Sequence, residues 1–192
     1  GDVAFVVSGR VQSLLQTERT MLNIMQRMSG IATVTHEYMA RLEGLHTRVL
    51  DTRKTTPGMR ILEKEAVRIG GGVNHRIGLF DMILLKDNHV DFAGGIEAAI
   101  TRCHRYLEEK GKNLKIEIEV RNLNELGEVL RVGGVDRIML DNFTPELTRE
   151  AHCRSLRNRI VGRHYNRYDT RLCRVRGRFR IGRRIDPFGQ RS

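Results

Sequence analysis

The chain has 192 residues, enough to bury a hydrophobic core, and its net charge is +11, from 34 Lys and Arg against 23 Asp and Glu. Residues 152–192 carry that whole excess with 13 Arg, no Lys and two acids, so residues 1–151 are balanced. Three scattered Cys are too few for a disulfide framework, and the sequence supports neither a signal peptide nor a transmembrane helix. We expect an internal piece of a soluble, cytoplasmic protein.

The first third of the chain predicts two helices and one strand. Apolar residues at helical spacing indicate a helix from 17 to about 42 that begins at Thr17 or a neighbour. Residues 46–50 read as a strand, followed by a polar loop. A second helix is expected at 60–69, and the three glycines at 70–72 should end it.

Strands and helices alternate through the rest of the balanced region. Asn122 with Glu125 indicates a capping box, and Thr144 followed by Pro145 indicates the N-cap and first residue of another helix. The predicted elements are strands at 82–85, 115–120 and 137–140, and helices at 95–110, after Asn122 and after Thr144. Short connections between alternating strands and helices predict an α/β fold with a parallel sheet or barrel.

Polar residues gather where the predicted strands end, which is where such folds carry their chemistry. Three cationic clusters occupy 51–58, 70–76 and 86–89, and Arg and Lys in such clusters can neutralise carboxylates and phosphates. Glu119 and Asp141, near the ends of neighbouring strands, can hold a divalent cation or accept hydrogen bonds from sugar hydroxyls. The combination suits a reaction between an acidic ring and a phosphorylated sugar through a cationic centre.

Each of these features has an ordinary explanation when taken alone. A basic loop is usually a solvated surface, a single His is more often structural than catalytic, and a glycine run usually ends a helix. A single carboxylate on a strand is usually an ion-pair partner. The functional interpretation therefore depends on their occurring together.

The order and content of these motifs resemble the quinolinate phosphoribosyltransferase family, also called carboxylating nicotinate-nucleotide pyrophosphorylase. The resemblance covers residues 1–151. The matching stretches are ERTMLNIMQRMSGIAT from Glu18, DTRKTTPGMR from Asp51, EKEAVRIGGGVNHRIGLFDMILLKDNH from Glu63, IEIEV from Ile116 and IMLDN from Ile138.

The resemblance implies a partial open α/β barrel, TIM-like and of phosphoribosyltransferase type II, which is truncated at both ends. It implies a pentosyltransferase of NAD biosynthesis that converts quinolinate and phosphoribosyl pyrophosphate, with Mg²⁺, into nicotinate mononucleotide, pyrophosphate and CO₂. It further implies a homodimer or higher homo-oligomer, with no membrane or nucleic-acid partner.

The resemblance also assigns site residues. Arg53, His75 and Arg76 would hold the quinolinate carboxylates, beside Thr52, while Lys54 and Lys86 would face phosphoribosyl pyrophosphate and the shared centre of the site. Glu119 and Asp141 would bind ribose hydroxyls and Mg²⁺, directly or indirectly. The catalytic set is Lys54, Lys86, Glu119 and Asp141.

Residues 152–192 depart from the family and are predicted to form a disordered, Arg-rich tail. Reading residues 157–192 one base later, with permitted codons, yields a stop-free string that contains the family's Ser-Gly-Gly and Gly-Ala-Leu-Thr-His segments. We therefore infer a frameshift near His152 and expect this chain itself to be inactive. Two alternatives stay open: a nucleic-acid-binding protein that uses the basic tail, and a related pyrophosphorylase with another heterocyclic acid as substrate.

Overall fold

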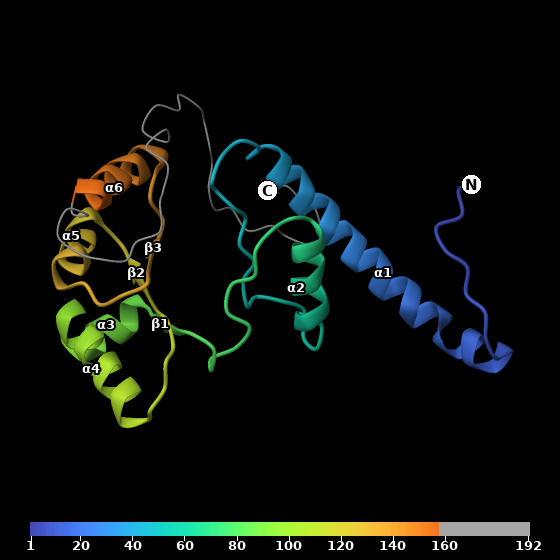
Figure 1. Ribbon diagram of the computed structural model, residues 1–192, viewed down its shortest axis with the longest axis horizontal. Coiled ribbons are helices and arrows are strands. Elements are labelled where there is room, and N and C mark those ends of the chain that lie inside the picture. Colours follow the sequence, from blue (N-terminus) through green and yellow to red (C-terminus); the bar gives the residue numbers. More distant parts are fainter. Residues whose placement is uncertain (158–192) are drawn as a thin grey trace. The chain divides into compact units, whose positions relative to one another are not determined.

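The structure, a computed structural model, describes the backbone of residues 1–157 and the side chains of residues 1–154. The chain divides into two compact units, Gly1–Gly78 and Leu79–Ser192 (Figure 1). The tail predicted at 152–192 therefore lies almost wholly outside the described residues. Among the helices that are described, none combines the length and apolar composition that a membrane span requires.

The first unit contains two helices that pack against each other, α1 (Val11–Ala40) and α2 (Arg60–Ile69). The prediction for α2 is confirmed at both ends. The predicted start of α1 at Thr17 is wrong, because the Thr17 hydroxyl donates to the carbonyl of Ser13 at 2.8 Å and so lies inside the helix. A Thr in that position satisfies its own side chain without ending the helix.

The glycines after α2 do more than end it. A Cβ on Gly70 would lie 2.5 Å from the carbonyl oxygen of Ala32 and 2.6 Å from Cβ of Thr35, both on α1. A Cβ on Gly72 would lie 2.7 Å from Cγ1 of Val67. Since real Cβ atoms do not approach so closely, Gly70 allows α1 to pack directly on the end of α2. This finding favours the structural explanation of the glycine run over a phosphate-binding role.

The strand predicted at 46–50 is wrong, because only one isolated parallel bridge forms there, between Leu50 and Val73. The amide of Val73 donates to the carbonyl of Val49 at 2.8 Å, and the amide of Asp51 donates to the carbonyl of Val73 at 3.2 Å. The ladder ends after these two bonds because the partner segment is preceded by glycines and followed by a polar loop. The bridge still joins the two polar loops that follow Leu50 and Val73.

The second unit is an α/β unit with one parallel sheet of three strands in the order β1-β2-β3. Figure 1 shows its helices along one side of the strands. Its elements are β1 (Ile83–Leu85), α3 (Asp87–Ala93), α4 (Ile96–Glu109), β2 (Ile116–Val120), α5 (Leu123–Val132), β3 (Arg137–Leu140) and α6 (Pro145–Arg157). The predicted α/β class and parallel sheet are confirmed.

The two faces of this sheet differ in chemistry because side chains alternate along each strand. One face presents Ile116, Ile118 and Val120, which are at most 2% exposed. They form one core with apolar residues of the covering helices, among them Ile96, Ala99, Ile100, Leu126 and Val129. The other face carries Glu117, only 1% exposed, whose carboxylate accepts from Arg137 Nη1 of β3 at 3.4 Å.

The helices of the second unit begin close to where the sequence predicts, except for α3, which the sequence does not predict. Asn122 Oδ1 accepts from the amides of Asn124 and Glu125, which confirms it as the N-cap of α5. The Glu125 carboxylate accepts from the amide of Arg121 instead of that of Asn122, so the box is displaced by one residue. Thr144 caps α6 through the amide of Leu147. Helix α3 was not predicted, because Asp87–Ala93 is short and mostly polar.

Candidate active site

A buried carboxylate joins the two polar loops of the first unit. The side chain of Asp51 accepts from Nζ of Lys64 and, at 2.8 Å, from the backbone amide of His75. With the Asn74 amide turned so that its nitrogen faces acceptors, it donates to Asp51 Oδ2 and to the carbonyl of Lys64, both at 2.9 Å. Only 6% of the Asp51 side chain and 3% of the Lys64 side chain are exposed. Asp51 therefore fixes the loop that begins at its own position to the loop around His75.

A second charged cluster holds the far end of the first loop. Glu63 of α2 accepts from Arg27 Nε of α1 at 2.6 Å and from the amide of Thr56 at 3.3 Å. Nη2 of Arg27 also donates to the Thr56 hydroxyl at 2.6 Å. The loop from Asp51 to Thr56 is thus tied at both ends to α2.

Arg53 lies in the middle of this loop and is half-buried. Its Nε is buried and has no hydrogen-bond partner within the described residues. A buried donor without an acceptor costs about 1–3 kcal/mol, so such a group calls for a specific reason. An anionic ligand that accepts from the guanidinium would remove this cost, which fits the predicted role of Arg53 in holding a carboxylate.

The other predicted residues of the first unit lie on the same two loops. The Thr52 hydroxyl accepts from the amide of Lys54 at 3.0 Å, so Thr52 shapes the turn that carries the exposed Lys54. His75 and Arg76 are half-buried and follow directly after the segment held by Asp51. The five predicted residues of this unit therefore lie on two loops that Asp51 joins.

The three predicted residues of the second unit share one edge and one face of its sheet. Glu119 on β2 lies opposite Met139 on β3, and the amide of Asp141 donates to the carbonyl of Val120 at 3.0 Å, so the pairing continues to Asp141. Lys86 directly follows β1 with extended backbone angles and continues the register toward Glu119. Since residues in register share a face, Lys86, Glu119 and Asp141 lie together at the carboxyl edge of the sheet.

The number of carboxylates at this edge matches what a protein usually supplies to Mg²⁺. Within the part of the chain that the structure describes, no group of three or more His, Cys, Asp or Glu is placed to hold a metal. Mg²⁺ commonly takes only one or two protein carboxylates and fills its remaining positions with water and phosphate oxygens. Glu119 and Asp141 supply that number. Asn142 follows in the left-handed conformation (φ 55°) and donates to Asp141 at 2.9 Å, which orients its carboxylate.

An arginine supports the same edge from outside the predicted set. Arg121 directly follows β2 and donates to Glu125 of α5 and to Asp91 of α3. The hydrogen bond to Glu125, and to a smaller extent the one to Asp91, raises the pKa of Arg121, so its guanidinium stays charged. This bridge ties the start of α5 to α3, the helix that begins directly after Lys86.

Sequence reasoning missed the residues that support the site. The sequence predicts a cluster around Asp51 but no role for Asp51 itself, and it predicts only a helical position for Lys64, Glu63 and Arg27. A sequence signal exists for two of them, because Glu63 and Lys64 lie on a short helix that begins close after the polar loop. Nothing in the local pattern shows that these two charged residues are buried.

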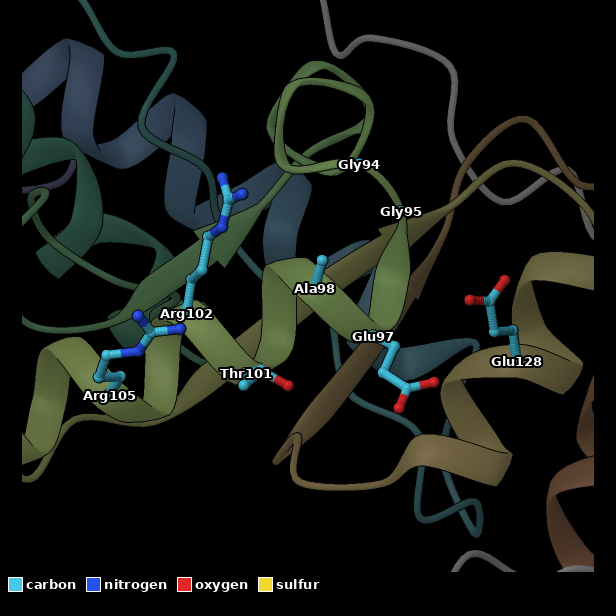
Figure 2. Close-up of a pocket in the computed structure, with 8 residues that line it drawn as sticks. All are labelled: Gly94, Gly95, Glu97, Ala98, Thr101, Arg102, Arg105 and Glu128. Carbon is cyan, nitrogen blue, oxygen red and sulfur yellow. The ribbon is translucent and has the colours of Figure 1, made fainter.

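Figure 2 shows a shallow recess beside the start of α4 that none of the predicted site residues lines. Glu97 of α4 and Glu128 of α5 extend toward the gap between the helices, while Arg102 and Arg105 lie further along α4. Glu97 pairs with Arg131 of α5 at 2.9 Å, and both side chains are well exposed. The recess is therefore an ordinary charged surface between two helices.

Comparison with known proteins points to a single family. The sequence model described as "Quinolinate phosphoribosyl transferase, C-terminal domain" matches residues 31–161. Quinolinate phosphoribosyltransferase (decarboxylating) 1b from Nicotiana tabacum is 45% identical over 148 residues, covering 74% of this chain and 41% of that protein. Nicotinate-nucleotide pyrophosphorylase (carboxylating), chloroplastic, from Arabidopsis thaliana is 47% identical over 146 residues, covering 73% and 41%.

A solved structure gives the same result. The nicotinate-nucleotide pyrophosphorylase from Francisella tularensis matches with a TM-score of 0.69 and 45% identity, covering 76% of this chain and 50% of that one. The chain thus spans half or less of the length of these relatives.

Proposed function

The chain belongs to the quinolinate phosphoribosyltransferase family, and from this premise we propose that it serves the transfer of a phosphoribosyl group from phosphoribosyl pyrophosphate to quinolinate. Decarboxylation then gives nicotinate mononucleotide, CO₂ and pyrophosphate for NAD biosynthesis. One observation carries the proposal: the matched region, residues 31–161, includes all eight predicted site residues, from Thr52 to Asp141.

The first unit would bind quinolinate. Arg53, His75 and Arg76 would hold its carboxylates, and the buried Arg53 Nε supports this role because a carboxylate would supply the acceptor that it lacks among the described residues. Lys54, exposed on the same loop, would face phosphoribosyl pyrophosphate. Thr52 would keep that loop in shape through its bond to the Lys54 amide.

The second unit would bind the sugar and its pyrophosphate. Glu119 and Asp141 would accept from ribose hydroxyls and hold Mg²⁺, which would neutralise charge on the pyrophosphate when bound. Their negative charge would also stabilise the positive charge that develops on the ribose as the bond to pyrophosphate breaks. Lys86, in register beside Glu119, would hold the departing pyrophosphate.

Three further features belong to the proposal. The three-stranded sheet would be part of an open α/β barrel, and the active form would be a homodimer or higher homo-oligomer. The compartment would be the cytoplasm. Cys103, on α4, is a free cysteine, which is usual in a reducing compartment.

The test is release of CO₂ from carboxyl-labelled quinolinate in the presence of phosphoribosyl pyrophosphate and Mg²⁺. We expect turnover from the frame-corrected protein, and loss of turnover on adding EDTA. Glu119→Gln should reduce the rate about 100-fold or more, because one charge that stabilises the transition state is removed. Glu97→Gln, in the exposed pair with Arg131, is the matched control and should leave the rate unchanged.

The outcome also separates the related alternative. If the corrected protein releases no CO₂ from quinolinate but releases pyrophosphate with another heterocyclic acid, the protein is a related pyrophosphorylase with a different substrate. The 192-residue chain itself is expected to show no turnover.

We also propose that residues 152–192 result from a change of reading frame. The family match ends at residue 161, so residues 162–192 lie outside it. Sequencing the gene together with mass spectrometry of the C-terminal peptide tests this. An intact frame that encodes an expressed basic tail would refute it, and salt-sensitive RNA binding by that tail would then favour a nucleic-acid role.

A further inference from the structure

We propose that Arg60 and Lys64 of α2 are positioning residues that set the spacing between the two quinolinate-binding loops and thereby select two adjacent carboxylates. The inference rests on the proposed function, because it assigns the ligand of those loops. All the contacts that carry it lie within the first unit.

Arg60 joins the two loops through a single guanidinium. Its Nη2 donates to the carbonyl of Arg53 at 3.3 Å, and its Nη1 donates to the carbonyl of Ile77 at 3.2 Å. Its Nε donates to the Thr55 hydroxyl at 3.2 Å. The first and third contacts lie on the loop of Arg53, and the second lies one residue after Arg76. The planar guanidinium therefore fixes the distance between these two segments.

Lys64 makes the same kind of link one helical turn later. Its Nζ donates to the carbonyl of His75 at 3.1 Å and to the carboxylate of Asp51. Because residues four apart lie on the same face of a helix, Arg60 and Lys64 form one cationic edge of α2. That edge binds the backbone of Arg53 and of His75, which are themselves proposed ligands of the substrate.

The groups that accept hydrogen bonds from Arg60 indicate that this side chain positions the loops and does not neutralise a negative charge. They are two backbone carbonyls and a hydroxyl, all of them uncharged. A Lys in this position keeps the positive charge but is a single point donor, so it cannot span both carbonyls as the fork of an Arg does. Replacement of Arg60 by Lys therefore separates positioning from simple attraction of an anion.

The spacing of the loops bears directly on specificity. A ring with two neighbouring carboxylates must engage Arg53 on one loop and His75 or Arg76 on the other at the same time. A ring with one carboxylate needs only one loop, so it gains little from a fixed spacing. Preorganisation by Arg60 should thus favour the dicarboxylate over the monocarboxylate.

The experiment measures binding by the full 192-residue chain, with quinolinate and with pyridine-3-carboxylate, by calorimetric or NMR titration. Arg60→Lys should weaken quinolinate binding about tenfold or more, since small misplacements of binding groups carry penalties of this size. Binding of the monocarboxylate should change less than about threefold. Arg68→Lys on the same helix, whose partner is the exposed Glu65, is the matched control and should change neither.

Amide hydrogen exchange provides a readout that needs no ligand. Arg60→Lys should speed exchange in residues 52–56 and 74–77 together, whereas Arg68→Lys should not. If Arg60→Lys leaves exchange in these segments unchanged, or lowers affinity for both acids equally, the positioning role is wrong. If exchange rises in both segments while neither the 192-residue chain nor the frame-corrected protein binds quinolinate, the positioning role holds and the proposed substrate is wrong.

Discussion

The two units of the chain stabilise their structures by different means. In the first unit the buried residues are mostly polar or small: Thr35, Glu63, Lys64 and Ala66, together with Gly70 and Gly72 after α2. In the second unit the buried residues are mostly large and apolar, and Ile116, Ile118, Val120, Leu126 and Val129 form one continuous core. Charged contacts fix the loops of the first unit, whereas apolar packing supports the sheet of the second.

The two means of stabilisation match where the predicted site residues lie in each unit. The predicted residues of the first unit lie on loops, and a loop needs specific hydrogen bonds to keep one conformation. Those of the second unit lie at the ends of strands, so the sheet register already places them. The first unit also leaves several large apolar side chains exposed, including Val6, Val11, Leu15, Ile61 and Ile69. Its structure should accordingly be the more sensitive to loss of a single charge.

Lys64→Met should have the largest effect on stability. It leaves the carboxylate of Asp51 buried without its cation, and breaking a buried pair in this way costs about 3–5 kcal/mol. Amide exchange of His75, whose amide donates to Asp51, should rise strongly. Chemical denaturation followed by hydrogen exchange measures both.

Two further variants decide what the Lys64 result means. Asp51→Asn combined with Lys64→Met removes both charges and should recover part of the loss, whereas Lys110→Met on the exposed end of α4 should change stability by less than about 0.5 kcal/mol. A Lys64 variant as stable as the Lys110 variant would contradict the contrast between the units.

Ile118→Ala should be the most damaging single truncation in the second unit. Ile118 is fully buried at the centre of β2, and replacing such an Ile by Ala costs about 2–5 kcal/mol because it leaves a cavity. Ile118→Val should cost only about 0.5–1.5 kcal/mol. The two variants should differ in denaturation midpoint while His75 keeps its protection, and equal midpoints would show that the core is not tightly packed there.

The fold was predictable from sequence where local patterns are strong. Helix α2 has the predicted bounds because its amphipathic pattern stops at three glycines, and β2 and β3 follow from short alternating or apolar runs. Helix α3 lacks such a pattern, and residues 46–50 have strand-like composition without a neighbouring strand of sufficient length. Strand pairing is a tertiary property, so composition alone could not exclude that strand.

Asn122→Ala should have a moderate effect, again within the second unit. Asn122 caps α5 by accepting from two backbone amides, and loss of an N-cap costs about 1 kcal/mol. Asn124→Ala is the matched control, because Asn124 is exposed inside the first turn, where Ala is the better helix former. Thermal denaturation should show a lower midpoint for the Asn122 variant alone; a similar drop in both would mean that the cap contributes little.

The eight residues of the candidate site follow from the family resemblance and from the ends of predicted strands, and their roles stay predictions. The residues that support them could not be found from the sequence. The roles of Lys64 and Arg60 depend on contacts with residues 7 to 17 positions away across loops. A Lys or Arg on a short helix normally reads as solvated surface, so their contacts to loop carbonyls required coordinates.

The smallest expected effect concerns Cys103 of α4, which packs against the core of the second unit. Burial raises the pKa of its thiol, so the folded chain keeps that proton to higher pH. The stability that comes from keeping this thiol protonated is present below the pKa of the thiol in the unfolded chain. It is lost as the pH rises through the pKa of the thiol in the folded chain.

At pH 8, alkylation of Cys103, measured by peptide mass spectrometry, should be slower in the folded chain than in the urea-unfolded chain. Ile118→Ala should speed it and Lys64→Met should not, because the charge lost in Lys64→Met belongs to the first unit; equal acceleration by both would show that the two units do not stabilise themselves separately.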